Sequence, residues 1–140
     1  MSEQVILIFG ASGIIGRALV QNLSNASGCR VLAASRRPEE SLSNNVVPYT
    51  VDLNDFKSAN FEPLASVTHV VYTAYVDKPT WEEQRQPNTD MFRHALEIVV
   101  EACPNLSHVT LLQGTKAYGA HLGPFKTPAK ESDPRIPNGY

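Results

Sequence analysis

The sequence predicts an α/β fold in which helices cover both faces of a doubly wound parallel sheet. Short apolar runs recur along the chain and alternate with segments of helical period, which is the pattern of successive strand–helix–strand units. The first run, residues 5–9, is followed at once by a glycine-rich turn and a helix. Crossover connections of this kind are right-handed and give parallel strands.

The first strand and the first helix are the most sharply defined elements. Residues 5–9 are apolar throughout, as expected of a strand that is covered on both faces. Apolar residues then recur at helical spacing from Ile14 to about Leu23, and Ser27 and Gly28 supply a stop.

Four further strands are expected, at residues 30–35, 46–51, 69–73 and 109–112. A longer helix is expected between the last two of them, starting at Trp81 or Asn88 and ending at Ala102. Its core-facing stripe consists of Met91, Ala95, Ile98, Val99 and Ala102. Trp81 either packs at the start of this helix or lines a substrate cavity.

The turn after the first strand has three glycines, at positions 1, 4 and 7 of Gly-Ala-Ser-Gly-Ile-Ile-Gly. The first permits a tight turn, the second lets backbone amides approach a pyrophosphate, and the third lets the helix pack close to the sheet. The unpaired amides and the positive dipole end of the helix suit an anion. We therefore expect a dinucleotide cofactor to bind at Gly10, Ser12, Gly13, Ile14, Ile15 and Gly16. The alternative is a turn that merely connects two elements.

The end of the second strand predicts NADP(H) as the cofactor. An acidic residue at this position bonds the ribose hydroxyls of NAD, whereas arginine accommodates the phosphate of NADP. The residues here are Ser35, Arg36 and Arg37, which offer a hydroxyl and two guanidinium groups to a phosphate. Alternatively, the two arginines belong to a solvated turn and pair with Glu39 and Glu40.

Residues at the ends of the later strands complete the expected cofactor site. Asp52 and Leu53 follow the third strand and are expected to contact the adenine, although Asp52 is equally suited to cap a helix starting near Asn54. Thr73 and Gln113, at the ends of the fourth and fifth strands, are expected to contact the cofactor as well.

With GASGIIG, SRR and VDL in this order, the chain resembles the extended and atypical short-chain dehydrogenase/reductases, whose NAD(P)-binding part is a Rossmann fold. Gln-Gly-Thr-Lys-Ala-Tyr-Gly at 113–119, followed by Leu-Gly-Pro-Phe at 122–125, resembles the lysine-bearing motif of the progesterone 5β-reductase and iridoid synthase family. The resemblance implies that hydride from NADPH reaches the β-carbon of an activated enone, with Lys116 as the catalytic lysine.

The family's catalytic tyrosine lies beyond a proline-rich loop, in an asparagine-aromatic-tyrosine context. Tyr140, after Asn138 and Gly139, is the matching residue here, with glycine in place of the aromatic. A developing oxyanion needs a hydrogen-bond donor or a cation, and an ammonium group lowers the pKa of a nearby phenol. The alternative for Lys116 is an ordinary exposed loop lysine. Tyr118 is expected to pack, because Leu122 stands where the common Tyr-x-x-x-Lys pair would need a lysine.

Two regions are expected: a dinucleotide-binding Rossmann core at residues 1–116, and an incomplete proline- and glycine-rich active-site loop at residues 117–140. The fold is expected to lack its C-terminal strands and its substrate lobe. An incomplete sheet leaves apolar surface exposed, which favours association, for example as a homodimer.

Composition excludes several functions. The net charge of −2 is not gathered into a basic surface, so nucleic acid is not an expected partner. No apolar run is long enough to span a membrane and the N-terminus lacks a basic segment, so we expect a cytoplasmic protein that acts on a small molecule. The two cysteines, Cys29 and Cys103, are expected as buried thiols. The four histidines are too scattered for a metal site.

Two other functions remain open from the sequence. One is an NAD-dependent sugar-nucleotide epimerase or dehydratase on the same fold. The other is a non-catalytic NADP(H)-binding module.

Overall fold

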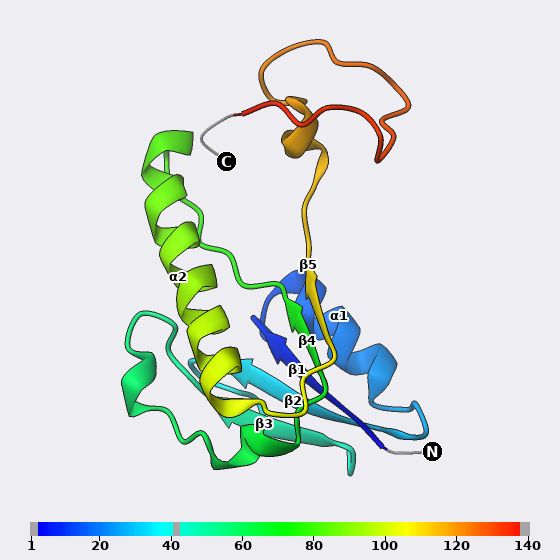
Figure 1. The fold of residues 1–140 in the computed structure, drawn as a ribbon, viewed down its shortest axis with the longest axis vertical. Coiled ribbons are helices and arrows are strands. Elements are labelled where there is room, and N and C mark those ends of the chain that lie inside the picture. Colours follow the sequence, from blue (N-terminus) through cyan, green and yellow to red (C-terminus); the bar gives the residue numbers. More distant parts are fainter. Residues whose placement is uncertain (1–2, 41–42, 138–140) are drawn as a thin grey trace.

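The computed structural model describes residues 3–40 and 43–137. Its centre is a single five-stranded parallel sheet with the strand order β3-β2-β1-β4-β5 (Figure 1). The strands are β1 (Gln4–Phe9), β2 (Cys29–Ser35), β3 (Val46–Thr50), β4 (His69–Tyr72) and β5 (His108–Leu111). The α-helices are α1 (Ile14–Leu23) and α2 (Trp81–Ala102). The predicted doubly wound α/β fold is confirmed, and every predicted strand is present.

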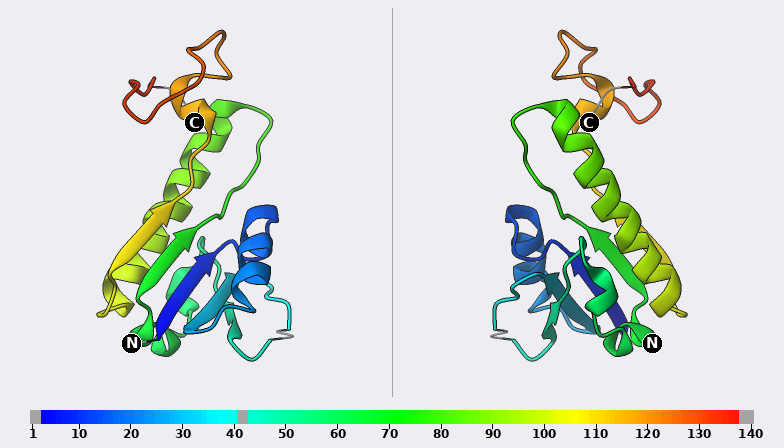
Figure 2. Two further views of the ribbon diagram at one scale, coloured as in Figure 1. Left: turned by 90° about the vertical axis from the view of Figure 1, so that its right-hand side faces the viewer. Right: turned by 90° about the vertical axis from the view of Figure 1, so that its left-hand side faces the viewer.

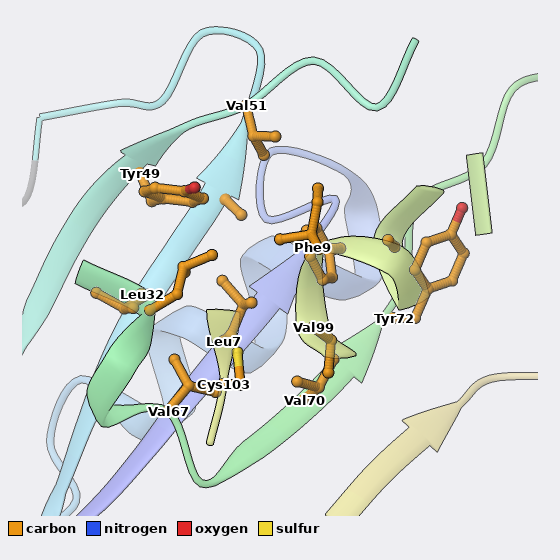
Figure 3. Close-up of a cluster of buried hydrophobic side chains, with 14 of the residues drawn as sticks. Leu7, Phe9, Leu32, Tyr49, Val51, Val67, Val70, Tyr72, Val99 and Cys103 are labelled. Carbon is orange, nitrogen blue, oxygen red and sulfur yellow. The ribbon is translucent and has the colours of Figure 1, made fainter. Parts of the chain in front are cut away.

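The two α-helices lie on opposite faces of the sheet (Figure 2). Successive residues of β1 alternate between the faces, so Ile8 joins the cluster beneath α1, whereas Leu7 and Phe9 join the cluster beneath α2. The cluster on the α2 side is the larger of the two and includes Val99 and Cys103 (Figure 3).

Helix α2 begins at the earlier of its two predicted starts. Thr80 caps it, because its hydroxyl accepts a hydrogen bond from the Glu83 amide while the Glu83 carboxylate accepts one from the Thr80 amide. The predicted stripe packs on the sheet, with Ala95, Ile98 and Val99 buried.

The connection between β3 and β4 differs from the prediction. A helix was expected near Asn54, but the described chain has two short 3₁₀ helices there, η1 (Phe56–Ser58) and η2 (Glu62–Ser66). Asp52 accepts a hydrogen bond from the Asn54 amide at 2.9 Å and so closes a turn rather than capping an α-helix. This stretch has no apolar stripe of helical period, so nothing favours a long helix there.

The segment after β5 lies away from the sheet. It forms a third short 3₁₀ helix, η3 (Thr115–Tyr118), at the level of the start of α2 (Figure 1). The loop that follows folds back, with the Ile136 amide donating to the Ala117 carbonyl at 3.0 Å. The Lys126 ammonium lies 2.7 Å from the Asp133 carboxylate and keeps the pKa of that carboxyl group below its usual range.

Cys29 and Cys103 are buried free thiols, as predicted. None of the helices in the described part of the chain is long and apolar enough to cross a membrane.

Candidate functional site

A cleft of about 570 Å³ opens at the carboxyl edge of the sheet. Its walls come from the turn between β1 and α1, the end of β2, the segment after β3 and the segment after β4. Most of the residues predicted to bind a cofactor line it, namely Gly10, Ser12, Gly13, Ile14, Ile15, Ser35, Arg36, Asp52, Leu53 and Thr73. Gly16, Arg37 and Gln113 do not line this cleft.

The turn before α1 presents main-chain amides to the cleft. Gly10 has a φ of 79°, which favours glycine, and a Cβ atom there would lie 2.6 Å from the Ala74 backbone nitrogen. Gly13 is the N-cap of α1, and no side-chain hydrogen bond caps the helix. No acidic residue lies in the first turn, so its amides and dipole are available to an anion. Ile14, next to them, lines the cleft and is 94% exposed.

The end of β2 provides a hydroxyl and one guanidinium group. Ser35 is 8% exposed, lines the cleft, and its Oγ atom has no hydrogen-bond partner among the described residues. A buried hydroxyl without a partner is costly, which is consistent with a missing ligand atom. Arg36 also lines the cleft.

In the described part of the chain, Arg36 and Arg37 do not pair with Glu39 and Glu40, the ion pairs that the alternative interpretation of this turn requires. The Glu39 carboxylate pairs with Arg17 at 2.6 Å, and within the described ranges neither Arg36 nor Arg37 makes an ion pair with an acidic residue. The alternative in which these arginines pair with nearby glutamates is therefore not the arrangement in this structure.

The segment after β3 is held by helix α2. Leu53 is buried, and its carbonyl oxygen accepts a hydrogen bond from Nδ1 of His94. The His94 ring also packs on Phe56, with 4.9 Å between the ring centroids. These contacts fix the Asp52–Leu53 backbone where it forms part of the cleft wall.

Thr73 has a structural task at the cleft. Its hydroxyl donates to the Phe9 carbonyl at 2.7 Å and lies 3.2 Å from the Gly10 carbonyl. The side chain therefore ties the end of β4 to the start of the glycine-rich turn. The contact of Thr73 with a cofactor stays a prediction, and the residue does line the cleft.

Two amide side chains that sequence reasoning missed fix the segment after β4. Gln84 is 4% exposed, accepts a hydrogen bond from the Tyr75 hydroxyl, and donates to the Asp77 carboxylate and to the Lys78 carbonyl at 2.8 and 2.7 Å. Asn88 holds both the amide and the carbonyl of Val76, each at 2.9 Å. The available signal was their i, i+4 spacing, which places both on one face of a helix.

This pair of side chains positions a whole wall of the cleft. Tyr75, Val76 and Lys78 all line it, and each of the three is held by a hydrogen bond with Gln84 or Asn88.

Lys116, one of the two predicted catalytic residues, does not line this cleft. Lys116 belongs to η3, and its Nζ atom lies 3.7 Å from the centroid of the Trp81 ring. The Gln113 side-chain oxygen accepts a hydrogen bond from Arg135. Tyr118 is half-buried and lines a separate hollow of about 460 Å³ within the C-terminal segment. Tyr140 lies outside the described residues.

Burial raises the pKa of three groups in the core. The pKa of Tyr49 and of Tyr72 is raised to about 12, and that of the Cys103 thiol to about 11, in each case mainly by desolvation. None of the three lines the cleft, so their perturbed ionisation belongs to the core rather than to the site. Among the described residues, no group of three or more metal-ligating side chains is assembled.

The chain is similar in sequence to known proteins. Residues 49–140 match the model of the PRISE-like Rossmann-fold domain. A 3-oxo-Δ4,5-steroid 5β-reductase of Arabidopsis thaliana is 34% identical over 131 residues, which is 88% of this chain and 33% of the relative. An (S)-8-oxocitronellyl enol synthase of Nepeta cataria is 33% identical over 132 residues, which is 89% of this chain and 33% of the relative.

The fold also matches solved structures. The structure of a short-chain dehydrogenase/reductase superfamily protein of Agrobacterium tumefaciens with bound NAD superposes with a TM-score of 0.74 at 21% identity, over 96% of this chain and 40% of that one. The two curated relatives named above are longer proteins, and the chain spans about a third of the length of each.

Proposed function

Because the chain belongs to the PRISE-like Rossmann-fold family, we propose that it binds NADP(H) as part of an oxidoreductase. The proposed reaction is the reduction of the activated C=C bond of an enone, or of a carbonyl group, in a small molecule. The observation that carries the proposal is the cleft at the carboxyl edge of the sheet, where an uncapped helix N-terminus, a buried hydroxyl without a partner and an arginine converge.

The residues around the cleft fit a phosphorylated dinucleotide. The first-turn amides of α1 suit the pyrophosphate without any charged side chain. The Ser35 hydroxyl and the Arg36 guanidinium suit the additional phosphate that distinguishes NADP from NAD. No acidic residue stands at the end of β2 to prefer unphosphorylated ribose hydroxyls. This donor set supports NADP(H) over NAD(H).

The chemistry proposed for the protein follows from its family motif. When bound, the reduced nicotinamide supplies a hydride to the substrate. The ammonium group of Lys116 would stabilise negative charge that develops on the substrate oxygen, and it would lower the pKa of a phenol that donates the proton. Tyr140 is the proposed phenol.

Turnover tests this function in a protein that carries the substrate lobe as well as these residues, because the chain spans only about a third of the length of its curated relatives. We expect NADPH to be oxidised in the presence of a small enone such as cyclohex-2-enone, and Lys116→Ala to lower the rate about a hundredfold or more. Lys130→Ala is the matched control, because Lys130 is an exposed lysine of the C-terminal segment.

Two other outcomes would contradict the proposal. Tight NADPH binding without turnover of any enone or carbonyl compound would favour a non-catalytic module. A clear preference for NADH, with no effect of Arg36→Ala, would favour an epimerase-like enzyme.

A further inference from the structure

Trp81 is the first residue of α2, and its backbone is fixed by two neighbouring contacts. On one side, Thr80 and Glu83 form the capping box that starts the helix. On the other, the buried Gln84 anchors the segment after β4 to the first turn of the same helix. The indole ring is therefore carried on a well-defined turn, even though Trp81 is 40% exposed.

Two side chains of the C-terminal segment meet this ring. Nζ of Lys116 lies 3.7 Å from the ring centroid, well inside the range of about 6 Å for a cation–π contact. The His121 ring contacts it edge to face, with centroids 5.1 Å apart. Figure 1 shows η3 beside the start of α2. Trp81 thus brings the start of the helix into contact with the lysine-bearing segment.

We propose that Trp81 is a positioning residue for Lys116. An ammonium group is attracted to the face of an indole ring, whereas a neutral amine gains little from it. The contact therefore restricts where the long side chain of Lys116 places its charge. Trp81 acts only through Lys116 and is not itself a catalytic residue. The inference rests on the proposed function, because the role of Lys116 is assigned there.

The contact can be tested without turnover, because Trp81 is the only tryptophan in the chain. We expect Lys116→Met to change the intensity or the wavelength of tryptophan emission at neutral pH. Lys116→Arg keeps a cation over the ring, so it should change the emission much less, and Lys130→Met should leave it unchanged. Identical emission from the wild type and Lys116→Met would overturn the contact.

The role in turnover is tested by Trp81→Leu and Trp81→Phe. Trp81→Leu removes the π face, and we expect kcat to fall about two- to fivefold, the range for a cation–π contact at a partly exposed site. KM for NADPH should not change, because the cleft residues are intact. Trp81→Phe keeps an aromatic face, so its kcat should lie between those of Trp81→Leu and the wild type. If Trp81→Leu does not fold, Trp81→Phe provides the test in its place.

A double-mutant cycle separates positioning from a general structural role. In a Lys116→Met background, Trp81→Leu should not lower the residual rate further. An equal loss in both backgrounds, or no loss in the wild-type background, would overturn the inference while the proposed function stands. A Lys116→Met variant with an unchanged rate would instead remove the catalytic role assigned to Lys116, on which the inference rests.

Discussion

Gly16 packs directly against Gly10: a Cβ atom on Gly16 would lie 2.2 Å from the Gly10 carbonyl oxygen and 2.8 Å from the Ala11 Cα. The first turn of α1 can approach the end of β1 this closely only without a side chain. The helix N-terminus is thereby placed over the cleft.

Gly16→Ala should therefore be strongly destabilising. Both neighbouring atoms belong to the backbone, so the overlap cannot be relieved by a change of rotamer, and we expect a loss of about 2–3 kcal/mol of unfolding free energy. Urea denaturation followed by circular dichroism measures it. Gly114→Ala is the control, because a Cβ atom there meets nothing within 4 Å, and its stability should be unchanged or slightly higher.

Gln84→Ala should lower both stability and cofactor affinity. The substitution leaves the Lys78 carbonyl without its partner and releases one wall of the cleft. We expect a loss of about 1–3 kcal/mol and a several-fold weaker affinity for NADPH. Gln86→Ala is the matched control, because Gln86 is exposed and, among the described residues, its amide bonds only the Asp90 carboxylate, at 3.0 and 3.1 Å. Equal effects of the two substitutions would refute the role of Gln84 in holding the wall.

Two buried tyrosines should respond in opposite ways to loss of the hydroxyl. Tyr49 donates to the Asn60 carbonyl at 3.0 Å, so Tyr49→Phe should cost about 1 kcal/mol. The Tyr72 hydroxyl has no partner among the described residues, so Tyr72→Phe should leave stability unchanged or raise it by about 1 kcal/mol. Chemical denaturation of both variants under the same conditions checks the difference.

Stability should decline in alkaline solution. The pKa values of Tyr49, Tyr72 and Cys103 are higher in the folded protein than the values of about 10 for a free tyrosine and about 9 for a free thiol. The unfolded chain therefore releases these protons first, and their contribution is present below about pH 9 and is lost as the pH rises towards 12. Urea midpoints between pH 8 and 11.5 measure it. A midpoint that stays constant over this range would contradict the raised pKa values of these three groups in the folded protein. Tyr72→Phe removes one of the three groups, so it should make the decline less steep.

Local patterns in the sequence were enough to predict the sheet and the glycine-rich turn. Each strand boundary lies within one or two residues of its prediction, because the runs of apolar residues that enter the core are bounded by polar residues or glycine. The start and end of α1 follow likewise from the positions of Gly13 and the residues after Leu23.

Contacts between distant segments could not be predicted in this way. The bonds from Gln84 and Asn88 to the segment after β4, and that from His94 to Leu53, depend on where α2 lies against the sheet. The position of Lys116 over Trp81 likewise depends on how the C-terminal segment folds back. The two 3₁₀ helices between β3 and β4 were missed because such short turns have no periodic signal.

Calorimetric titration of the full chain with NADPH and with NADH tests most directly whether the cleft is a dinucleotide site that selects the phosphorylated cofactor. We expect NADPH to bind at least about tenfold more tightly than NADH. Arg36→Ala should weaken NADPH binding about ten- to a hundredfold and leave NADH unaffected, whereas Arg37→Ala, outside the cleft wall, should have a smaller effect. Folded protein that binds neither nucleotide would contradict the assignment of the cleft.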